Sequence, residues 1–127
     1  MALRKAHQAG VRIVGLCLGA FVVAEAGLLD QKMATTHWAF AKEFLQRFPQ
    51  VHLDPNVLYV DNGDVITSAG TAAGIDCCLH VLRSQYGAEA AAHVARRLVV
   101  APHRQGGQAQ YIEQPVPTLA SDDRLST

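Results

Sequence analysis

Residues 11–21 read VRIVGLCLGAF, an apolar run that stops at a cysteine and continues as a helix-forming segment. A buried strand followed by a small residue, a nucleophile, a small residue and a helix is the pattern of a nucleophile elbow. Gly15 and Gly19 flank Cys17, where we expect a tight turn to need glycine on both sides. The helix that follows points its N-terminus at the thiol, which favours the thiolate. The pattern therefore predicts either a cysteine nucleophile or a fold that descends from proteins with a cysteine nucleophile.

The composition is that of one small globular domain. Half of the 127 residues are hydrophobic, 17% are charged and the net charge is zero at pH 7. A core is therefore available, and a nucleic-acid-binding surface within this chain is disfavoured. No apolar run reaches the ~18 residues that span a bilayer, and the start lacks a signal peptide's apolar stretch, so we expect no membrane partner. Of the three cysteines, Cys77 and Cys78 are adjacent, which gives no disulfide framework and favours a cytoplasmic location.

Predicted strands and helices alternate along the chain, which favours an α/β layered fold. The expected strands are 11–16, 33–35, 57–60 and 65–67, and the expected helices are 3–9, 20–26, 36–48, 72–85 and 88–100. The first strand is apolar throughout, as in strands that are buried on both faces of a parallel sheet. Asn62-Gly63 between two β-type runs predicts a hairpin. Only one parallel core strand is clear, so we expect the chain to be a piece of a larger domain.

Three of these helices carry apolar residues at helical spacing, and we expect each apolar face to be buried. The three faces are Phe40, Phe44, Leu45 and Phe48; Ile75, Leu79 and Leu82; and Ala91, Val94, Ala95 and Leu98. Asp76 lies within the second helix, and we expect it to hydrogen-bond the turn before that helix. Cys77 and Cys78 point about 100° apart on the helix, which disfavours a shared metal and predicts core packing.

Several segments of the chain resemble one known family. They are CLGAF at 17–21, AGLLD at 26–30, ATTHW at 34–38, DNG at 61–63, TSAGTAAGID at 67–76, ARRLVV at 95–100 and PHRQGGQAQY at 102–111. Together they resemble the glutamine-amidotransferase-like (PfpI-type) domain of AraC-type transcriptional regulators, over nearly the whole chain. The stretch 103–111 is characteristic of the regulators rather than of free-standing enzymes.

This resemblance implies a partial three-layer sandwich of the class I glutamine amidotransferase-like (flavodoxin-like) type in residues 1–114. It implies that strands and a helix upstream of Leu3 are absent, and that residues 115–127 are a linker toward an absent helix-turn-helix DNA-binding domain. DNA would then be bound only outside this chain. A basic cluster is interpreted as a solvated helix end favoured by the helix dipole, with a contact to that domain and a contact to DNA as the alternatives. Its members are Arg96, Arg97, His103 and Arg104.

Cys17 and His37 are the candidate catalytic residues, active or vestigial. In the wider superfamily a histidine after two threonines lies near the elbow cysteine, and Thr35-Thr36-His37 matches that pattern. His37 would orient or deprotonate the thiol. The alternative is structural: Cys17 is then a small buried residue at a tight turn, and His37 begins a helix. The candidate ligand pocket around the elbow comprises Gly15, Leu18, Gly19, Thr36, Ser68 and Gly70.

Departures from the enzymes of the superfamily weigh against catalysis. None of the six histidines has a glutamate two positions on, whereas amidotransferases use a His-x-Glu pair. Leu18 stands directly after the cysteine, where PfpI-type peptidases have histidine. A glutamate that often polarises the thiol belongs to the part of the domain expected upstream of Leu3. No pattern in the sequence predicts a cofactor or a metal site.

The sequence therefore favours the regulatory domain of an AraC-family transcriptional regulator. We expect it to be a homodimer that senses a small-molecule effector or transmits a dimer signal. The alternative is a PfpI-type cysteine hydrolase or amidase that uses Cys17 and His37. A third hypothesis is a truncated gene product without function.

Overall fold

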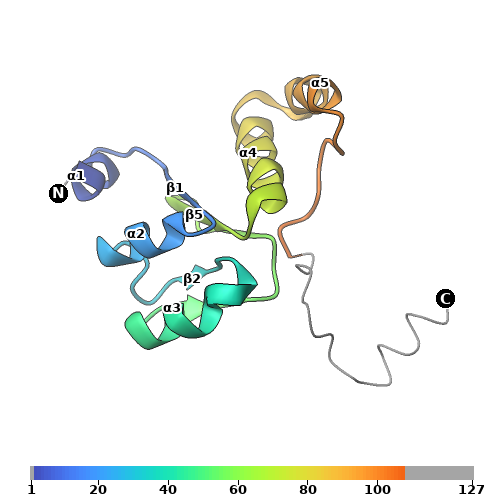
Figure 1. Cartoon of the computed structure of the whole chain (residues 1–127). Coiled ribbons are helices and arrows are strands. Elements are labelled where there is room, and N and C mark those ends of the chain that lie inside the picture. The colour runs from blue at the N-terminus through green and yellow to red at the C-terminus, as the bar shows by residue number, and fades with distance from the viewer. Residues whose placement is uncertain (1, 108–127) are drawn as a thin grey trace, which may run out of the picture.

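Helices and strands alternate along the chain, as predicted (Figure 1). The computed structural model describes residues 2–107, and the predicted linker lies outside them. In this part the helices are α1 (Ala2–Gln8), α2 (Gly19–Glu25), α3 (Ala41–Arg47), α4 (Thr71–Tyr86) and α5 (Ala88–Leu98), with a 3-10 turn, η1, at Trp38–Phe40. The strands are β1 (Ile13–Leu16), β2 (Met33–Ala34), β3 (His52–Leu53), β4 (Tyr59–Asp61) and β5 (Val65–Ser68).

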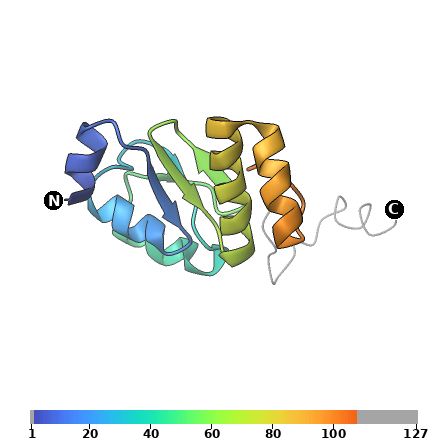
Figure 2. The same cartoon turned by 90° about the horizontal axis from the view of Figure 1, so that it is seen from above.

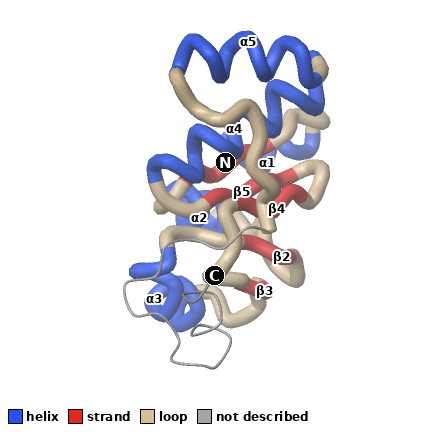
Figure 3. The backbone as a smooth tube through the Cα atoms, turned by 90° about the vertical axis from the view of Figure 1, so that its right-hand side faces the viewer, coloured by secondary structure: helices blue, strands red, loops and turns tan. Residues whose placement is uncertain are grey.

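The central sheet has three strands in the order β1-β5-β4. β1 and β5 are parallel, with Ile13 opposite Val65 and Leu16 opposite Ser68. β4 and β5 are antiparallel, and Gly63 in the turn between them has a φ of 89°. This confirms the predicted hairpin. β2 and β3 form a separate parallel pair, which Figure 3 shows beyond β4.

Two buried clusters flank the sheet, and β5 contributes to both because alternate residues of a strand face opposite sides. Val65 packs with Val23 of α2 and Phe44 of α3 in one cluster. Ile66 packs with Cys77 of α4 in the other. Figures 1 and 2 show α2 on one side of the sheet and α4 on the other. The predicted three-layer α/β sandwich is confirmed.

β1 is buried on one face only, so the prediction of burial on both faces is wrong for this strand. Ile13 and Gly15 are buried, whereas Val14 is 38% and Leu16 is 41% exposed. Among the described residues β1 forms an edge of the sheet, and α4 packs over β4 and β5. The strand that is buried throughout is β5.

The predicted apolar face of helix 36–48 is buried only in part. Phe44 and Phe48 are buried, but Phe40 and Leu45 are exposed. Phe40 belongs to the 3-10 turn η1, which takes it out of the α-helical register. Leu45 follows Phe44 directly and so points about 100° away from it around the helix.

The apolar faces of α4 and α5 are also only partly covered. Leu79 and Ala95 are buried, whereas Ile75 and Leu98 are exposed. Cys77 is buried as predicted, but Cys78 is exposed, so the prediction that both cysteines pack in the core is half wrong. Within residues 2–107 no helix has the length and apolarity that a bilayer span requires.

Candidate functional site

The chain turns sharply from β1 into α2 at Cys17. This residue has a φ of 54°, in the left-handed region that non-glycine residues rarely adopt. Its N–H donates to the carbonyl oxygen of Ser68 at 3.0 Å, and its own carbonyl oxygen accepts from the N–H of Ala20 at 3.2 Å. Strained backbone of this kind costs about 1–3 kcal/mol and collects at functional sites. The geometry is that of the predicted nucleophile elbow.

Of the two glycines at the elbow, only Gly15 is required by space. A Cβ at Gly15 would lie 3.0 Å from Cγ2 of Val23 and 3.1 Å from the backbone of Gly19. A Cβ at Gly19 would meet no atom within 4 Å, so the expectation that both positions need glycine is wrong for Gly19. The difference arises because α2 packs its Val23 directly onto Gly15.

A hydrogen bond and a close contact bring His37 to the elbow. Thr36 is buried, and its Oγ1 donates to the carbonyl oxygen of Cys17 at 2.8 Å. The ring of the next residue, His37, lies against Gly70, where a Cβ would be 2.8 Å from Cδ2 of the ring. Gly70 in turn lines a groove together with Cys17. Cys17 and His37 therefore share one neighbourhood, joined through Thr36 and Gly70.

His37 also has a structural part in its own segment. Its Nδ1 accepts a hydrogen bond from the N–H of Ala39 at 3.1 Å, at the start of η1. Its ring stacks on Trp38 with 5.6 Å between centroids and meets Phe40 edge-on at 5.9 Å. A neutral imidazole has one N–H and one lone pair. Because the N–H of Ala39 occupies the Nδ1 lone pair, that lone pair is not free to take a proton from a thiol.

The thiol of Cys17 has no activating partner among residues 2–107. No hydrogen bond joins its sulfur to His37 or to a carboxylate in that part of the chain. The residue is half-buried. A cysteine nucleophile depends on an adjacent base or cation that favours the thiolate. The elbow thus has the backbone shape of a nucleophile site without the hydrogen bond that would activate it.

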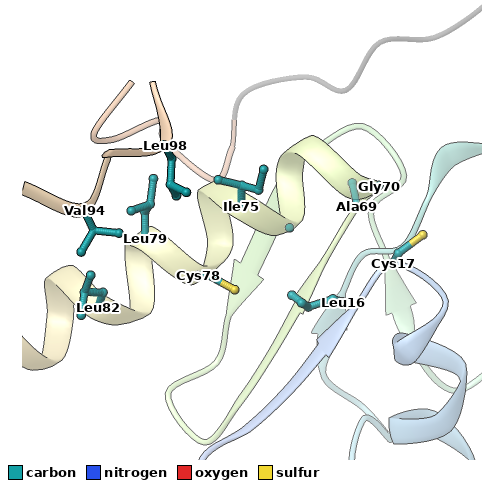
Figure 4. A pocket seen from close by; sticks show the side chains of 11 residues that line it. Leu16, Cys17, Ala69, Gly70, Ile75, Cys78, Leu79, Leu82, Val94 and Leu98 are labelled. Atoms are coloured by element: carbon teal, nitrogen blue, oxygen red, sulfur yellow. The ribbon is translucent and has the colours of Figure 1, made fainter. Parts of the chain in front are cut away.

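An apolar groove begins beside Cys17 and runs between β1, α4 and α5 (Figure 4). Its volume is about 470 Å³, within the range of small-molecule sites. Figure 4 shows Cys17 and Gly70 at one end of the groove, with the sulfur of Cys17 pointing away from Leu16. No charged side chain of the described residues lines it: the walls are Leu16, Cys17, Ala69, Gly70, Gly74, Ile75, Cys78, Leu79, Leu82, Val94 and Leu98.

Of the six residues predicted to form a ligand pocket, Gly70 lines this groove and the other five do not. Ser68 and Thr36 are buried and bond the backbone of Cys17. Leu18 is 46% exposed, outside the groove. From the sequence, the walls contributed by α4 and α5 are predicted to pack in the core. The sequence does not distinguish a buried core face from an uncovered groove wall, because apolar residues occur at the same helical spacing in both.

The two adjacent cysteines lie in different surroundings. Cys77 belongs to the buried cluster beneath α4, and burial raises the pKa of its thiol to about 12. Cys78 is exposed and lines the groove (Figure 4). Neighbouring residues on a helix point about 100° apart, which explains why one thiol is buried and the other is accessible.

A second polar site links α4 to residues 103–107. Nε and Nη2 of Arg104 donate to Oδ2 of Asp76 at 2.9 and 2.7 Å. The hydroxyl of Tyr59 donates to the carbonyl oxygen of Arg104 at 2.7 Å. The bond to Asp76 raises the pKa of Arg104, and burial raises the pKa of Tyr59. Two predictions are wrong here: the partner of Asp76 is Arg104 rather than the turn before α4, and Arg104 is not part of a solvated cluster.

Two acidic residues of the β4–β5 hairpin, one at the end of β4 and one in the turn, pair with histidines. Oδ2 of Asp64 accepts from Nζ of Lys32 and pairs with Nε2 of His7, both at 2.7 Å, and these bonds hold the pKa of Asp64 well below its usual range. Oδ2 of Asp61 pairs with Nε2 of His80 at 2.7 Å. Burial opposes the ionisation of Asp61, but hydrogen bonds from His80 and the turn backbone outweigh it and lower the pKa. Among the described residues no three His, Cys, Asp or Glu side chains gather as a metal site.

A three-layer α/β sandwich with a strained cysteine between a strand and a helix defines the α/β proteins that carry a nucleophile elbow. The DJ-1/PfpI family matches residues 1–84. The chain belongs to this family, and the matched span holds the elbow, the Thr35-Thr36-His37 segment and most of α4.

The curated relatives include transcriptional regulators and an enzyme. Over 98 residues the chain is 38% identical to the HTH-type transcriptional regulator CdhR of Pseudomonas aeruginosa, covering 77% of this chain and 29% of that protein. Over 112 residues it is 36% identical to the HTH-type transcriptional regulator ArgR of the same species, covering 88% and 34%. Over 90 residues it is 34% identical to the isonitrile hydratase of Pseudomonas putida, covering 71% and 38%. The chain thus spans about a third of the length of these relatives.

Solved structures share the fold. DJ-1beta of Drosophila melanogaster superposes with a TM-score of 0.68 at 26% identity, covering 79% of this chain and 52% of that chain. An AraC family transcriptional regulator from Pseudomonas putida gives 0.67 at 25% identity, covering 76% and 51%. The chain spans about half of each of these solved chains. The predicted fold class and the predicted likeness to AraC-type regulators are confirmed.

Proposed function

We propose that this chain is part of the regulatory domain of an AraC-family transcriptional regulator and binds a small effector beside Cys17. DNA is bound by a helix-turn-helix domain outside this chain, and the protein acts in the cytoplasm as a homodimer. The likeness to CdhR, ArgR and the AraC family structure supports this proposal. So does the PHRQGGQAQY stretch, which resembles the regulators rather than the enzymes.

The observation that carries the proposal is the hydrogen-bonding state of His37. Its Nδ1 accepts from the backbone of Ala39, and no described residue bonds the sulfur of Cys17. Catalysis by the elbow needs a base on the thiol. Ligand binding needs only a fixed concave shape with suitable walls. The strained turn at Cys17 provides a fixed backbone, and the groove provides the concave shape and the apolar walls.

The chemistry of the walls favours an uncharged effector with an apolar body. Within residues 2–107 no charged side chain lines the groove, so an ionic group entering it would lose hydration without a compensating partner among these residues. Leu16 and Ile75, both exposed, offer apolar surface within the groove. Burial of such surface contributes about 25 cal/mol per Å².

The proposal is tested with Nile red, a neutral apolar dye, and with a transcription reporter in the full-length protein. Ile75→Asp places a charge in the groove, whereas Val22→Asp places one on α2 at a residue that is 55% exposed outside it. We expect Ile75→Asp to lose both dye binding and effector-dependent transcription, and Val22→Asp and Cys17→Ser to retain both. Equal loss in both aspartate variants, or loss of transcription in Cys17→Ser, contradicts the proposal.

A second candidate function is isonitrile hydration, favoured by the 34% identity to isonitrile hydratase and by the strained cysteine. Hydration adds one water to R–N≡C and gives the formamide R–NH–CHO. The protein is incubated with an alkyl isonitrile, and the formamide is measured by mass spectrometry. We expect no more product than with Cys17→Ala. Product formation that requires both Cys17 and His37 would establish the enzyme instead.

A further inference from the structure

Residues 103–107, here called the strap, pack against the start of β4 (orange in Figure 1). The N–H groups of Leu58 and Tyr59 both donate to the carbonyl oxygen of Gly106, at 2.7 and 3.2 Å. A Cβ at Gly106 would lie 2.6 Å from the carbonyl oxygen of Tyr59 and 2.7 Å from its ring. The strap therefore approaches β4 so closely that only glycine fits at position 106.

The side chains of Tyr59, Asp76 and Arg104, here called the clamp, fix the strap to α4. Asp76 is only 8% exposed, and the guanidinium of Arg104 satisfies its Oδ2 with two hydrogen bonds. The hydroxyl of Tyr59 holds the backbone of Arg104. Removing the cation from a buried carboxylate is strongly unfavourable, so the positions of Asp76 and of the strap depend on each other.

α4 connects the clamp to the elbow. Its N-cap residue, Gly70, lies against the ring of His37 and lines the groove with Cys17. Asp76 follows six residues later, about 9 Å along the axis at 1.5 Å per residue. Because a hydrogen-bonded helix moves as a stiff element, a group that pushes on Gly70 also shifts Asp76 relative to Tyr59 on β4.

We propose that occupation of the elbow controls the position of the strap. A group that occupies the space beside Cys17 displaces the first turn of α4, breaks the hydrogen bonds of the clamp and frees the strap from β4. The inference rests on the proposed function, because it requires a ligand at this position. The strap is suited to release because residues 103–107 include no apolar side chain and are fixed by a few polar bonds. Segments of this kind open at low free-energy cost.

Trypsin, which cleaves after Arg104 when that peptide bond is accessible, reports the state of the strap. The full chain carries Cys78→Ser, so that Cys17 is the accessible thiol, and it is modified with N-ethylmaleimide to fill the space beside the elbow. We expect cleavage after Arg104 to become at least about tenfold faster, which corresponds to about 1.4 kcal/mol. Cleavage after Arg47, the last residue of α3, serves as the reference for opening elsewhere in the chain. A matched chain with Cys17→Ala, treated in the same way, shows no change.

Two variants test the clamp without the reagent. Asp76→Asn weakens the hold on Arg104 and is expected to give fast cleavage after Arg104 before modification, with little further increase after it. If cleavage after Arg47 also rises, the variant has unfolded, and Tyr59→Phe, which removes one bond to the strap, decides the question. Slow cleavage after Arg104 in the folded variants would contradict the claim that the clamp holds the strap. An unchanged rate of cleavage after Arg104 when Cys17 is modified would contradict the claim that the elbow is coupled to the strap. Neither measurement involves DNA or transcription. A failure of the proposed function is therefore detected separately, by the transcription reporter described above.

Discussion

Replacement of Cys17 by glycine is expected to leave the chain more stable than replacement by alanine, although glycine usually destabilises. Cys17 has a φ of 54°, a conformation that costs an L-residue about 1–2 kcal/mol and glycine nothing. Glycine adds conformational entropy to the unfolded chain, which offsets about 0.4–1 kcal/mol of this gain. Both variants lose the thiol, so that its contacts cancel in the comparison. The net difference is centred on about 0.8 kcal/mol in favour of glycine, within a range of about 0–1.6 kcal/mol.

The assay is urea unfolding at neutral pH, followed by far-ultraviolet circular dichroism, with stability taken from midpoint and slope. Val22 provides a control, because it lies inside α2 and is 55% exposed. There the order should reverse, with Val22→Gly less stable than Val22→Ala by about 1 kcal/mol. The reasoning is refuted if Cys17→Gly is the less stable of its pair, because the elbow would then not hold residue 17 in the left-handed region.

Three further predictions concern thiols, acid stability and the strap. Iodoacetamide should label Cys78 in the native chain and leave Cys77 unlabelled until the chain unfolds, as read by peptide mass spectrometry; native labelling of Cys77 would contradict its burial. Folding lowers the pKa of Asp64 from its ordinary 3.8, so its stabilisation is present above about pH 5 and is lost as the pH falls through the acid range. Asp64→Asn should therefore flatten the loss of thermal stability between about pH 5 and pH 2, and a slope equal to that of the unmodified chain would argue against this. Gly106→Ala should speed tryptic cleavage after Arg104, whereas Gly107→Ala, whose Cβ meets nothing within 4 Å, should not; equal rates would show that the strap is not packed as described.

The features that the sequence predicts well are local ones. The elbow follows from the strand, the cysteine and its neighbouring small residues, and the hairpin follows from Asn62-Gly63, because in each case residues a few positions apart determine the backbone path. Resemblance to a family predicts that the segment Thr35-Thr36-His37 lies near the elbow. The hydrogen bond from Thr36 to the carbonyl oxygen of Cys17 gives that placement its physical cause.

The features that the sequence does not predict depend on partners distant in the chain. The apolar run of β1 looks like a strand covered on both faces, but Leu16 is exposed because α4 packs over β4 and β5. Asp76 pairs with Arg104, 28 positions away, and nothing in the sequence near Asp76 indicates that partner. The hydrogen bond that occupies Nδ1 of His37 depends on the 3-10 turn at Trp38–Phe40, and the helical pattern of residues 36–48 does not predict that turn.

The central claim is that the elbow is a binding site whose cysteine is not activated by His37. It is tested most directly by the rate of Cys17 alkylation with iodoacetamide between about pH 6 and pH 9, in a Cys78→Ser background with and without His37→Ala. Because Nδ1 of His37 is bonded to the backbone of Ala39 and no hydrogen bond joins the ring to the thiol, the two pH profiles should coincide. A drop of about tenfold or more at neutral pH in His37→Ala would show that His37 favours the thiolate, and the chain would then have to be regarded as a cysteine enzyme.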